Sequence, residues 1–447
     1  MSRLSGTVDL LALHRHAPER YPFLLQSSAA TATLGRYDIL FGFPQAALVL
    51  SEPGQLSGPH SDGQGEFLRA LDRWWRAERS DAGKSQVAFS GGWFLYLGYE
   101  LAGEVEPALD LRPDPVLPVA LAVRCPVALV FDHQTNRCDI IIEESSPVDR
   151  GLIMADIEAC RSCEPRQGDQ SLSGSGAKEE EPSIFLEAVD RAKDYIARGD
   201  IYQANLSREW SATVAGQDCG DRIYDALRQT NPGPFAGLMD WNGVTVASSS
   251  PERLLLVRNG VISTRPIAGT HPRSDNPDND EILSAELISH PKERAEHVML
   301  IDLERNDLGR VCEPGSVEVD EMMVLESYAH VHHIVSNVRG RLREDVSPGD
   351  AIRAVFPGGT ITGCPKVRCM EIISELESGS RGAYTGSFGY LNLDGSMDLN
   401  ILIRTIVIRG NEVSLRAGSG IVADSEPQAE LAETRAKAKG LLQALSL

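Results

Sequence analysis

The segment at residues 289–310 constrains the fold most, because it predicts a helix whose inner side carries two carboxylates. Its sequence is SHPKERAEHVMLIDLERNDLGR, and Pro291 suits the first turn of a helix, where a missing N–H costs nothing. Glu293 and Glu296 are three residues apart and therefore share one helical face. Carboxylates among core residues are costly unless they are paired, bind a metal or face a polar cavity. Helix geometry alone favours the interpretation that Glu293 and Glu296 lie on a solvated face. The other segments of the chain determine whether a functional role is the better interpretation.

Composition and charge exclude several classes of protein. The chain has 447 residues and a formal net charge of −21, which argues against nonspecific binding to nucleic acid or to an anionic membrane. No apolar run approaches the roughly 18 residues of a membrane span, and the N-terminus lacks the apolar core of a signal peptide. We therefore expect a cytoplasmic protein without a membrane or nucleic-acid partner. An anionic substrate needs a local group of cations or a metal.

Cysteine usage indicates reduced thiols. Eight cysteines in a chain of this length do not resemble a disulfide scaffold. Cys160 and Cys163 form a lone CxxC, and no second pair stands at the spacing of a zinc site. We expect no metal or redox role for them.

The N-terminal part alternates between strand-like and helical patterns. Short apolar runs at 20–50, 87–99, 119–131 and 138–143 predict strands, and the spacing of large apolar residues at 66–78 predicts a helix. Residues 164–183 are rich in glycine, serine and acidic residues, which is typical of a flexible linker. We divide the chain into an N-terminal region (1–160), a linker (161–183) and a C-terminal domain (184–447).

The C-terminal part has more strands, set between helices. Strand-like runs occupy 235–248 and 253–264, and 321–339 reads as two strands joined by a bend. Three further runs at 384–393, 399–409 and 412–422 are predicted to be neighbouring strands. An alanine-rich helix ends the chain, with Ser425 and Pro427 where a cap and first turn belong.

Three local patterns could carry chemistry, although each has a plain structural explanation. Glu433 and Lys437 are four residues apart on the last helix, which is also the spacing of a surface ion pair. Glycine-rich turns at 357–366 and 417–421 expose backbone N–H groups that suit an anion, but neither has Walker A spacing. His333, in the segment AHVHHIVS, is a candidate catalytic histidine, and a structural histidine is the default alternative.

Several segments together resemble the chorismate-utilising enzymes over residues 185–445. They follow the family order: SSSPERL, TRPIAGT, KERAEHVMLIDLERNDLGRV, HHIVSNVRG, PGGTITGCPKVRCMEII, GAYTGSFGY, IRT, AGSGIV and ETRAKAKGLL. Residues 20–150 resemble the more variable N-terminal part of the same enzymes. The resemblance implies an α/β (α+β) fold, in which a large sandwich of two antiparallel sheets is surrounded by helices and residues 184–447 form the catalytic, chorismate-binding domain.

The resemblance also implies roles for individual residues. It implies a Mg²⁺ site at Glu296 and Glu433 supported by Glu293 and Glu430, and magnesium's preference for oxygen ligands is compatible with this. It implies that His333 assists departure of the substrate hydroxyl, that Glu252 assists proton transfer, and that Thr270 lies beside the attacked ring carbon. The implied substrate-binding residues are Gly269, Thr360, Tyr384, Arg404, Gly418, Gly420 and Lys437.

Within the family, two members use ammonia from a glutamine amidotransferase subunit: aminodeoxychorismate synthase and anthranilate synthase. The segments YQANLSREW, TITG and MDLNI resemble the aminodeoxychorismate synthases more closely. Ala268 in PIAGT departs from them, since they commonly carry lysine there, whereas anthranilate synthases carry alanine. A catalytically silent paralogue that only binds a ligand or a glutaminase is a third possibility.

The family's feedback segment is altered as well. Anthranilate synthases use an LLES segment for feedback by tryptophan, and this chain has Gln26 in place of the glutamate. Tryptophan binding is therefore left open.

Overall fold

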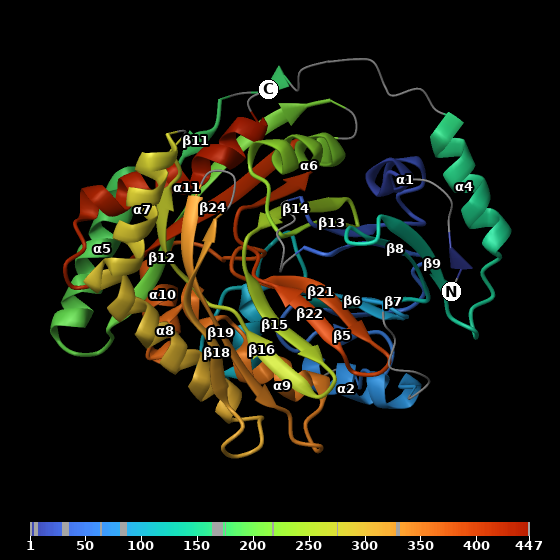
Figure 1. The fold of residues 1–447 in the computed structure, drawn as a ribbon, viewed down its shortest axis with the longest axis horizontal. Helices are drawn as coiled ribbons and strands as arrows, with labels where there is room; N and C mark the ends of the chain where they lie inside the picture. The colour runs from blue at the N-terminus through green and yellow to red at the C-terminus, as the bar shows by residue number, and fades with distance from the viewer. Residues whose placement is uncertain are drawn as a thin grey trace.

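Two antiparallel sheets face each other in the computed structural model, and helices cover their outer surfaces (Figure 1). The structure describes residues 2–3, 8–28, 35–62, 65–80, 87–162, 173–174, 176–216, 219–274, 276–327 and 331–445. The predicted fold class, a large two-sheet sandwich surrounded by helices, is confirmed. Cys163 and His330 of the sequence patterns, and residues 163–172 and 175 of the predicted linker, lie outside the described residues.

The first sheet is formed by thirteen strands of the described chain. Along its main path these are β1 (Ser2–Arg3), β9 (Arg137–Ile142), β8 (Val127–Asp132), β3 (Tyr37–Gly42), β2 (Phe23–Gln26), β13 (Phe235–Trp241), β14 (Val244–Ser250), β23 (Thr405–Arg409), β24 (Glu412–Ile421), β12 (Gln203–Ala215) and β10 (Ser173–Gly174), while β11 (Lys178–Glu179) and β20 (Gly363–Cys364) also pair with β12.

The second sheet contains eleven strands of the described chain. Its order is β17 (Ile267–Pro272), β19 (Val331–Arg341), β16 (Val261–Thr264), β15 (Arg253–Arg258), β22 (Met397–Asn400), β21 (Ser387–Asn392), β6 (Gly92–Leu97), β7 (Ala120–Cys125), β4 (Ala47–Leu50) and β5 (Leu56–Ser57), with β18 (Glu318–Ser327) paired to β19.

The described helices lie outside the two sheets (Figure 1). They are α1 (Leu10–His16), α2 (Phe67–Glu78), α3 (Ala102–Val105), α4 (Arg150–Ser162), α5 (Pro182–Ala197), α6 (Cys219–Thr230), α7 (Pro277–Ser289), α8 (Pro291–Gly309), α9 (Pro348–Val355), α10 (Lys366–Leu376) and α11 (Pro427–Leu445), with short 3₁₀ turns η1 (Tyr99–Leu101) and η2 (Gly359–Ile361). No helix in these stretches has both the length and the apolarity needed to cross a bilayer.

An aromatic core fills the space between the two sheets. Phe23 and Phe41 of the first sheet meet Phe94 of the second, and the rings of Phe23 and Phe94 stack with centroids 4.2 Å apart. On the outer face of the first sheet a second core involves α1, α4, α6 and α11, and on the outer face of the second sheet a third core involves α2, α8 and α9. These apolar layers supply most of the driving force for the fold.

Both sheets combine strands from the two ends of the chain. In the first, β2 pairs with β13, and in the second, β6 pairs with β21 along all six of its residues. The N-terminal strands are therefore hydrogen-bonded into the same sheets as the C-terminal ones. The division at 1–160, 161–183 and 184–447 stays a prediction about the sequence.

Two predicted strand runs are wrong in detail, because each divides between the sheets. The run at 119–131 becomes β7 in the second sheet and β8 in the first, with Pro126 between them. The run at 399–409 is likewise divided between the end of β22 and β23, so 384–393, 399–409 and 412–422 are not three neighbours. Apolar residues buried on both faces give no signal for the sheet to which each half belongs.

Candidate functional site

The candidate residues come from elements that are far apart in the sequence. Gly269 and Thr270 lie on β17, His333 on β19, Glu293 and Glu296 on α8, Gly418 and Gly420 on β24, and Glu430, Glu433 and Lys437 on α11. Helix α8 packs on β17 and β19, and α11 packs on β24. Thr360 belongs to η2. Glu252 and Arg404 lie in connections between strands, and Tyr384 lies in the connection between α10 and β21.

Glu252 and Arg404 occupy two of the connections by which the chain passes between the sheets. Glu252 follows β14 and precedes β15, and Arg404 follows β22 and precedes β23. The two connections are joined by a hydrogen bond from the Ile401 N–H to the Glu252 carbonyl (3.0 Å), and the Ser249 N–H donates to the Arg404 carbonyl (3.0 Å). Arg404 has a φ of 52°, which is unusual for a residue with a side chain. A pair of linked crossings thus places a carboxylate and a guanidinium in the same region.

The Glu252 carboxyl is buried close to two candidate substrate-binding cations. Its side chain is 5% exposed, and burial raises its pKa to about 7, although the Thr360 hydroxyl, the Ile267 N–H, Lys437 and Arg404 each lower it. Since the charge of Lys437 and of Arg404 acts on Glu252, these side chains belong to one electrostatic environment. A carboxyl that titrates near neutrality can accept and return a proton.

His333 lies on the strand that pairs with the PIAGT segment. It is directly opposite Thr270 in the register of β17 and β19, and its Nδ1 is 3.4 Å from the Gly269 carbonyl oxygen. Burial and the charge of Arg404 lower its pKa to about 4, so the imidazole is neutral at pH 7. A dianionic substrate that neutralises Arg404 and Lys437 would favour protonation of this ring.

The glycine-rich strand end of β24 is in close contact with Tyr384. A Cβ on Gly418 would lie 2.6 Å from the Tyr384 hydroxyl oxygen and 2.5 Å from the Leu206 carbonyl oxygen, so a larger residue does not fit. The Lys437 ammonium donates to the Gly418 carbonyl at 3.0 Å. Gly418 therefore lies between Tyr384 and Lys437. A Cβ on Gly420 would lie 2.5 Å from Nε2 of Gln203, which sequence analysis did not single out.

The four candidate metal ligands are on α8 and α11. Glu293 lies beside Gly269, since a Cβ on this glycine, whose φ is 69°, would be 2.9 Å from Glu293 Oε2. Glu433 forms an ion pair with Lys437 at 2.7 Å, as the sequence spacing predicted, and both side chains are about half exposed. Within the described residues, no three of the four glutamates bring ligand oxygens within 4.8 Å of one another. A donor set of carboxylate oxygens fits Mg²⁺.

Sequence analysis missed a second group of buried charges behind the site. Glu304 and Asp307 on α8 are 6% and 3% exposed, and the Lys366 ammonium pairs with Asp307. All three residues lie within motifs quoted above, where the helical spacing of Glu304 and Asp307 could have indicated a shared face.

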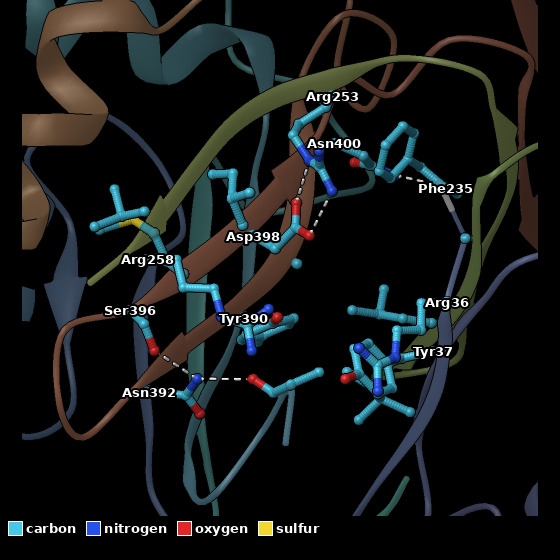
Figure 2. Close-up of a pocket in the computed structure, with 18 of the residues that line it drawn as sticks. Arg36, Tyr37, Phe235, Arg253, Arg258, Tyr390, Asn392, Ser396, Asp398 and Asn400 are labelled. Atoms are coloured by element: carbon cyan, nitrogen blue, oxygen red, sulfur yellow. Dashed lines mark hydrogen bonds and ion pairs between the residues drawn. The ribbon is translucent and has the colours of Figure 1, made fainter. Parts of the chain in front are cut away.

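A cavity of about 290 Å³ lies between the sheets, lined by none of the candidate site residues above (Figure 2). Tyr37 and Arg36 lie on one side of it and Tyr390 on the other, and Arg253 forms a two-bond ion pair with Asp398 at 2.8 and 3.0 Å. Gln26 also lines this cavity. Its amide contacts Tyr224, Arg228 and Asp38, so its polar atoms are engaged within the protein.

The fold and the placement of these segments agree with the comparison with known families. The chain belongs to the chorismate binding enzymes, whose family model matches residues 23–443. The predicted family resemblance is thus confirmed, and the protein belongs to a family of enzymes that act on chorismate.

Relatives named as aminodeoxychorismate synthase and as anthranilate synthase have similar sequence identity to this chain. The aminodeoxychorismate synthase component 1 of Bacillus subtilis is 38% identical over 425 residues, which cover 92% of this chain and 90% of the relative. An anthranilate synthase component I-like protein of Synechocystis is 42% identical over 360 residues, covering 80% and 73%. The crystal structure of anthranilate synthase component I from Streptococcus pneumoniae superimposes with a TM-score of 0.79 at 33% identity, covering 92% and 93%.

Proposed function

We propose that this chain is the chorismate-aminating component of an aminodeoxychorismate synthase, which forms 4-amino-4-deoxychorismate for 4-aminobenzoate and folate synthesis. The observation that carries amination of chorismate is the grouping of Glu252, His333, Arg404 and Lys437, in which two cations act on a buried carboxyl and a buried imidazole. Two cations can bind the two carboxylates of the substrate, and the two titratable groups can move its protons.

Each residue has a defined role in this proposal. Arg404, Lys437 and the backbone N–H groups around Gly418 and Gly420 bind carboxylates, while Tyr384 and Thr360 orient the ring. The ammonia nitrogen forms a bond to the ring carbon near Gly269 and Thr270, and the bond from the ring to the hydroxyl breaks. His333 supplies the proton with which the hydroxyl leaves as water, and Glu252 takes the proton lost by nitrogen.

Magnesium and a partner complete the proposed function. Glu296 and Glu433, supported by Glu293 and Glu430, would hold Mg²⁺, which binds carboxylate oxygens and offsets the negative charge of chorismate. Ammonia comes from a glutamine amidotransferase subunit, because the sequence shows no nucleophilic cysteine with an obvious histidine partner. The proposed location is the cytoplasm.

The choice between the two aminating branches depends on the flanking segments and on Gln26. The motifs YQANLSREW, TITG and MDLNI favour aminodeoxychorismate synthase. Gln26 replaces the feedback glutamate of anthranilate synthases, and its amide is occupied by Tyr224, Arg228 and Asp38. This supports a function outside the tryptophan branch, although we make no proposal for a ligand there.

Ala268 favours anthranilate synthase as the second candidate. The lysine that aminodeoxychorismate synthases commonly carry at this position could attack the ring and form a covalent adduct. An alanine cannot, so ammonia must attack the ring directly. A silent paralogue is less well supported, because a protein that only binds does not need the intact set of Glu296, His333, Arg404, Glu433 and Lys437.

Product identification tests the proposal. The purified chain is incubated with chorismate, Mg²⁺ and ammonium at high pH, where ammonia is more abundant, and the product is analysed by mass spectrometry. We expect a product that retains its enolpyruvyl group and gives 4-aminobenzoate only after a separate lyase is added. Glutamine should replace ammonium only when a glutaminase subunit is present. Release of pyruvate together with fluorescent anthranilate would show that the second candidate is correct.

A further inference from the structure

The acidic group behind Glu252 is not used by the roles assigned above. Glu304 lies beside η2, since a Cβ on Gly359 would be 3.3 Å from its Oε1, and the next residue, Thr360, lies close to Glu252. Glu252 and Asp307 both act electrostatically on Glu304, while the Thr264 hydroxyl lies close enough to lower its pKa. Asp307, Glu304 and Glu252 are therefore successive neighbours between α8 and the candidate site, and we refer to these three carboxyl groups as the line.

Glu304 is the carboxyl group of this line that lacks close contact with a cation, since Lys437 and Arg404 act on Glu252 and Lys366 acts on Glu304 only from its pair with Asp307. The Lys366 ammonium pairs with Asp307, whereas no lysine or arginine of the described chain forms an ion pair with Glu304. Glu304 is 6% exposed and Glu252 is 5% exposed, so solvent does little to offset their charge. Burying a carboxylate without a counter-charge is expensive. A small cation in direct contact with Glu304 would therefore stabilise its ionised form.

Hydrogen bonds are missing at the same place. Among the described side chains, Glu252 Oε1, Thr264 Oγ1 and Thr360 Oγ1 are buried atoms without a partner in hydrogen-bond geometry, although the two hydroxyls lie near enough to Glu304 and Glu252 to lower the pKa of these carboxyl groups. Buried polar atoms are normally satisfied, and three of them around two carboxyl groups indicate a small polar occupant. A cation with several N–H donors can satisfy both the charge and the acceptors.

We propose that Glu304, Glu252, Thr264 and Thr360 form a binding site for ammonium, the protonated form of the nucleophile, next to the substrate. This inference rests on the proposed aminating function. Ammonium donates hydrogen bonds to the carboxylates and the hydroxyls, gives one proton to the Glu304 carboxylate, and leaves ammonia whose lone pair forms the bond to the ring. Glu252 stays ionised and takes the proton that the nitrogen loses after the attack. The proton released by ammonium stays on the Glu304 carboxyl until the product departs.

The line also has an outer end. Asp307 and Lys366 help to line a cavity of about 760 Å³, together with Tyr202 and Met299. The cavity reaches the Asp307 end of the line, and neither Arg404 nor Lys437 is among the residues that line it.

The two carboxyl groups nearest the site can exchange protons near neutrality. Burial, with the charges of Asp307 and Glu252, raises the pKa of Glu304 to about 7, against the lowering effects of Lys366 and Thr264. Burial also raises the pKa of Glu252 to about 7. Such groups can hold a proton from ammonium and release it again.

The test compares Glu304→Gln with Glu286→Gln, which makes the same change on an exposed face of the neighbouring helix α7. In Glu304→Gln we expect the KM for ammonium to rise by about tenfold or more, since a charged hydrogen-bonding partner is lost, while the KM for chorismate changes by less than about twofold. Thr264→Val should raise the KM for ammonium in the same direction and guards against a folding defect of the first variant. Glu286→Gln should match the wild type.

A binding measurement that does not depend on turnover separates this inference from the proposed function. Ammonium chloride should raise the Tm of the wild type more than tetramethylammonium chloride at equal ionic strength, and Glu304→Gln should abolish the difference. An equal effect of the two salts on the wild type would mean that water fills the site and would overturn the inference. So would an unchanged KM for ammonium in both variants of an aminating enzyme. A wild type that shows the ammonium-specific shift but forms no aminated product would overturn the proposed function alone.

Discussion

Glu252 titrates within the pH range in which an enzyme of this kind is assayed. Burial raises the pKa of its carboxyl to about 7, so the group is largely protonated at pH 6 and largely ionised at pH 8. If the ionised form accepts the proton lost by nitrogen, kcat at saturating chorismate and ammonium should rise with pH through about 7. In Glu252→Gln that rise should disappear, and kcat should fall by about 100-fold or more. A variant that keeps both kcat and the pH profile would exclude the assignment.

The protonation state of His333 is a residue-scale finding that sequence could not supply. The HHIVS segment identified the residue, but the lowered pKa arises from burial and from Arg404, which lies about seventy positions along the chain. The identities of site residues were readable in the motifs, whereas their charge states depend on neighbours brought together by the fold. Glu304 illustrates the same limit, because its burial depends on η2 and β16 rather than on its own helix.

At the scale of elements, α8 and α11 are the two helices that present the candidate metal ligands. We expect Glu296→Gln and Glu433→Gln to keep the wild-type far-UV circular dichroism and Tm within a few degrees, while turnover at low Mg²⁺ falls to a few per cent or less. The physical reason is that a neutral amide is a poorer Mg²⁺ ligand than a carboxylate. Glu426→Gln, just before α11, is the control for a charge change near this helix. Wild-type turnover of either site variant over a Mg²⁺ titration would remove the residue from the metal site.

Helices α1 and α6 and strand β13 are tied together by one buried histidine. His14 donates from Nδ1 to the Tyr21 carbonyl (2.7 Å), and its Nε2 is 3.0 Å from Asp221 and 3.2 Å from Asp240. Burial lowers the pKa of His14, but hydrogen bonds to the two carboxylates outweigh burial and raise it to about 10. Because this value is above the unfolded value of about 6.5, the stabilisation is complete below pH 6.5 and is lost as pH rises through about 10.

This tie gives a stability prediction. His14→Gln should lower the free energy of unfolding by about 3 kcal/mol at pH 6, since the two carboxylates then lose the cation between them and, among the described residues, only Asp221 keeps a charged partner, Arg15, at 3.8 Å. The difference between wild type and variant should shrink as the pH is raised to 10, as measured by urea unfolding. A difference that is the same at both pH values would show that the imidazole is not charged in the folded protein.

The element patterns also show how far sequence alone could go. The helix with a clear apolar period, predicted at 66–78, matches the observed α2 to within one residue at its ends. The two errors concern strands that continue across Pro126 and across Ile401–Arg404 from one sheet to the other. Both sides of each crossing are apolar, because inner and outer faces of the sheets are covered, and a continuous apolar run does not reveal where a sheet changes.

At the scale of the whole molecule, the connections that join the two sheets of the sandwich also carry residues of the candidate site. The chain passes between the sheets at Glu252 and at Arg404, and the hydrogen bond between Ile401 and Glu252 holds the two crossings together. Side chains at these points are fixed by both sheets at once, which favours a pre-organised arrangement. The aromatic core between the sheets, with Phe23 stacked on Phe94, is part of the same support.

The pairing of β2 with β13 and of β6 with β21 has a consequence for synthesis on the ribosome. Translation proceeds at about 5–20 residues per second, so strands near the N-terminus emerge many seconds before their partners at residues 235–241 and 387–392. During that interval their open edges and apolar faces can pair with other nascent chains. The first sheet therefore lacks a partner for β2 until residues 235–241 are synthesised, and the second lacks a partner for β6 until residues 387–392 are synthesised.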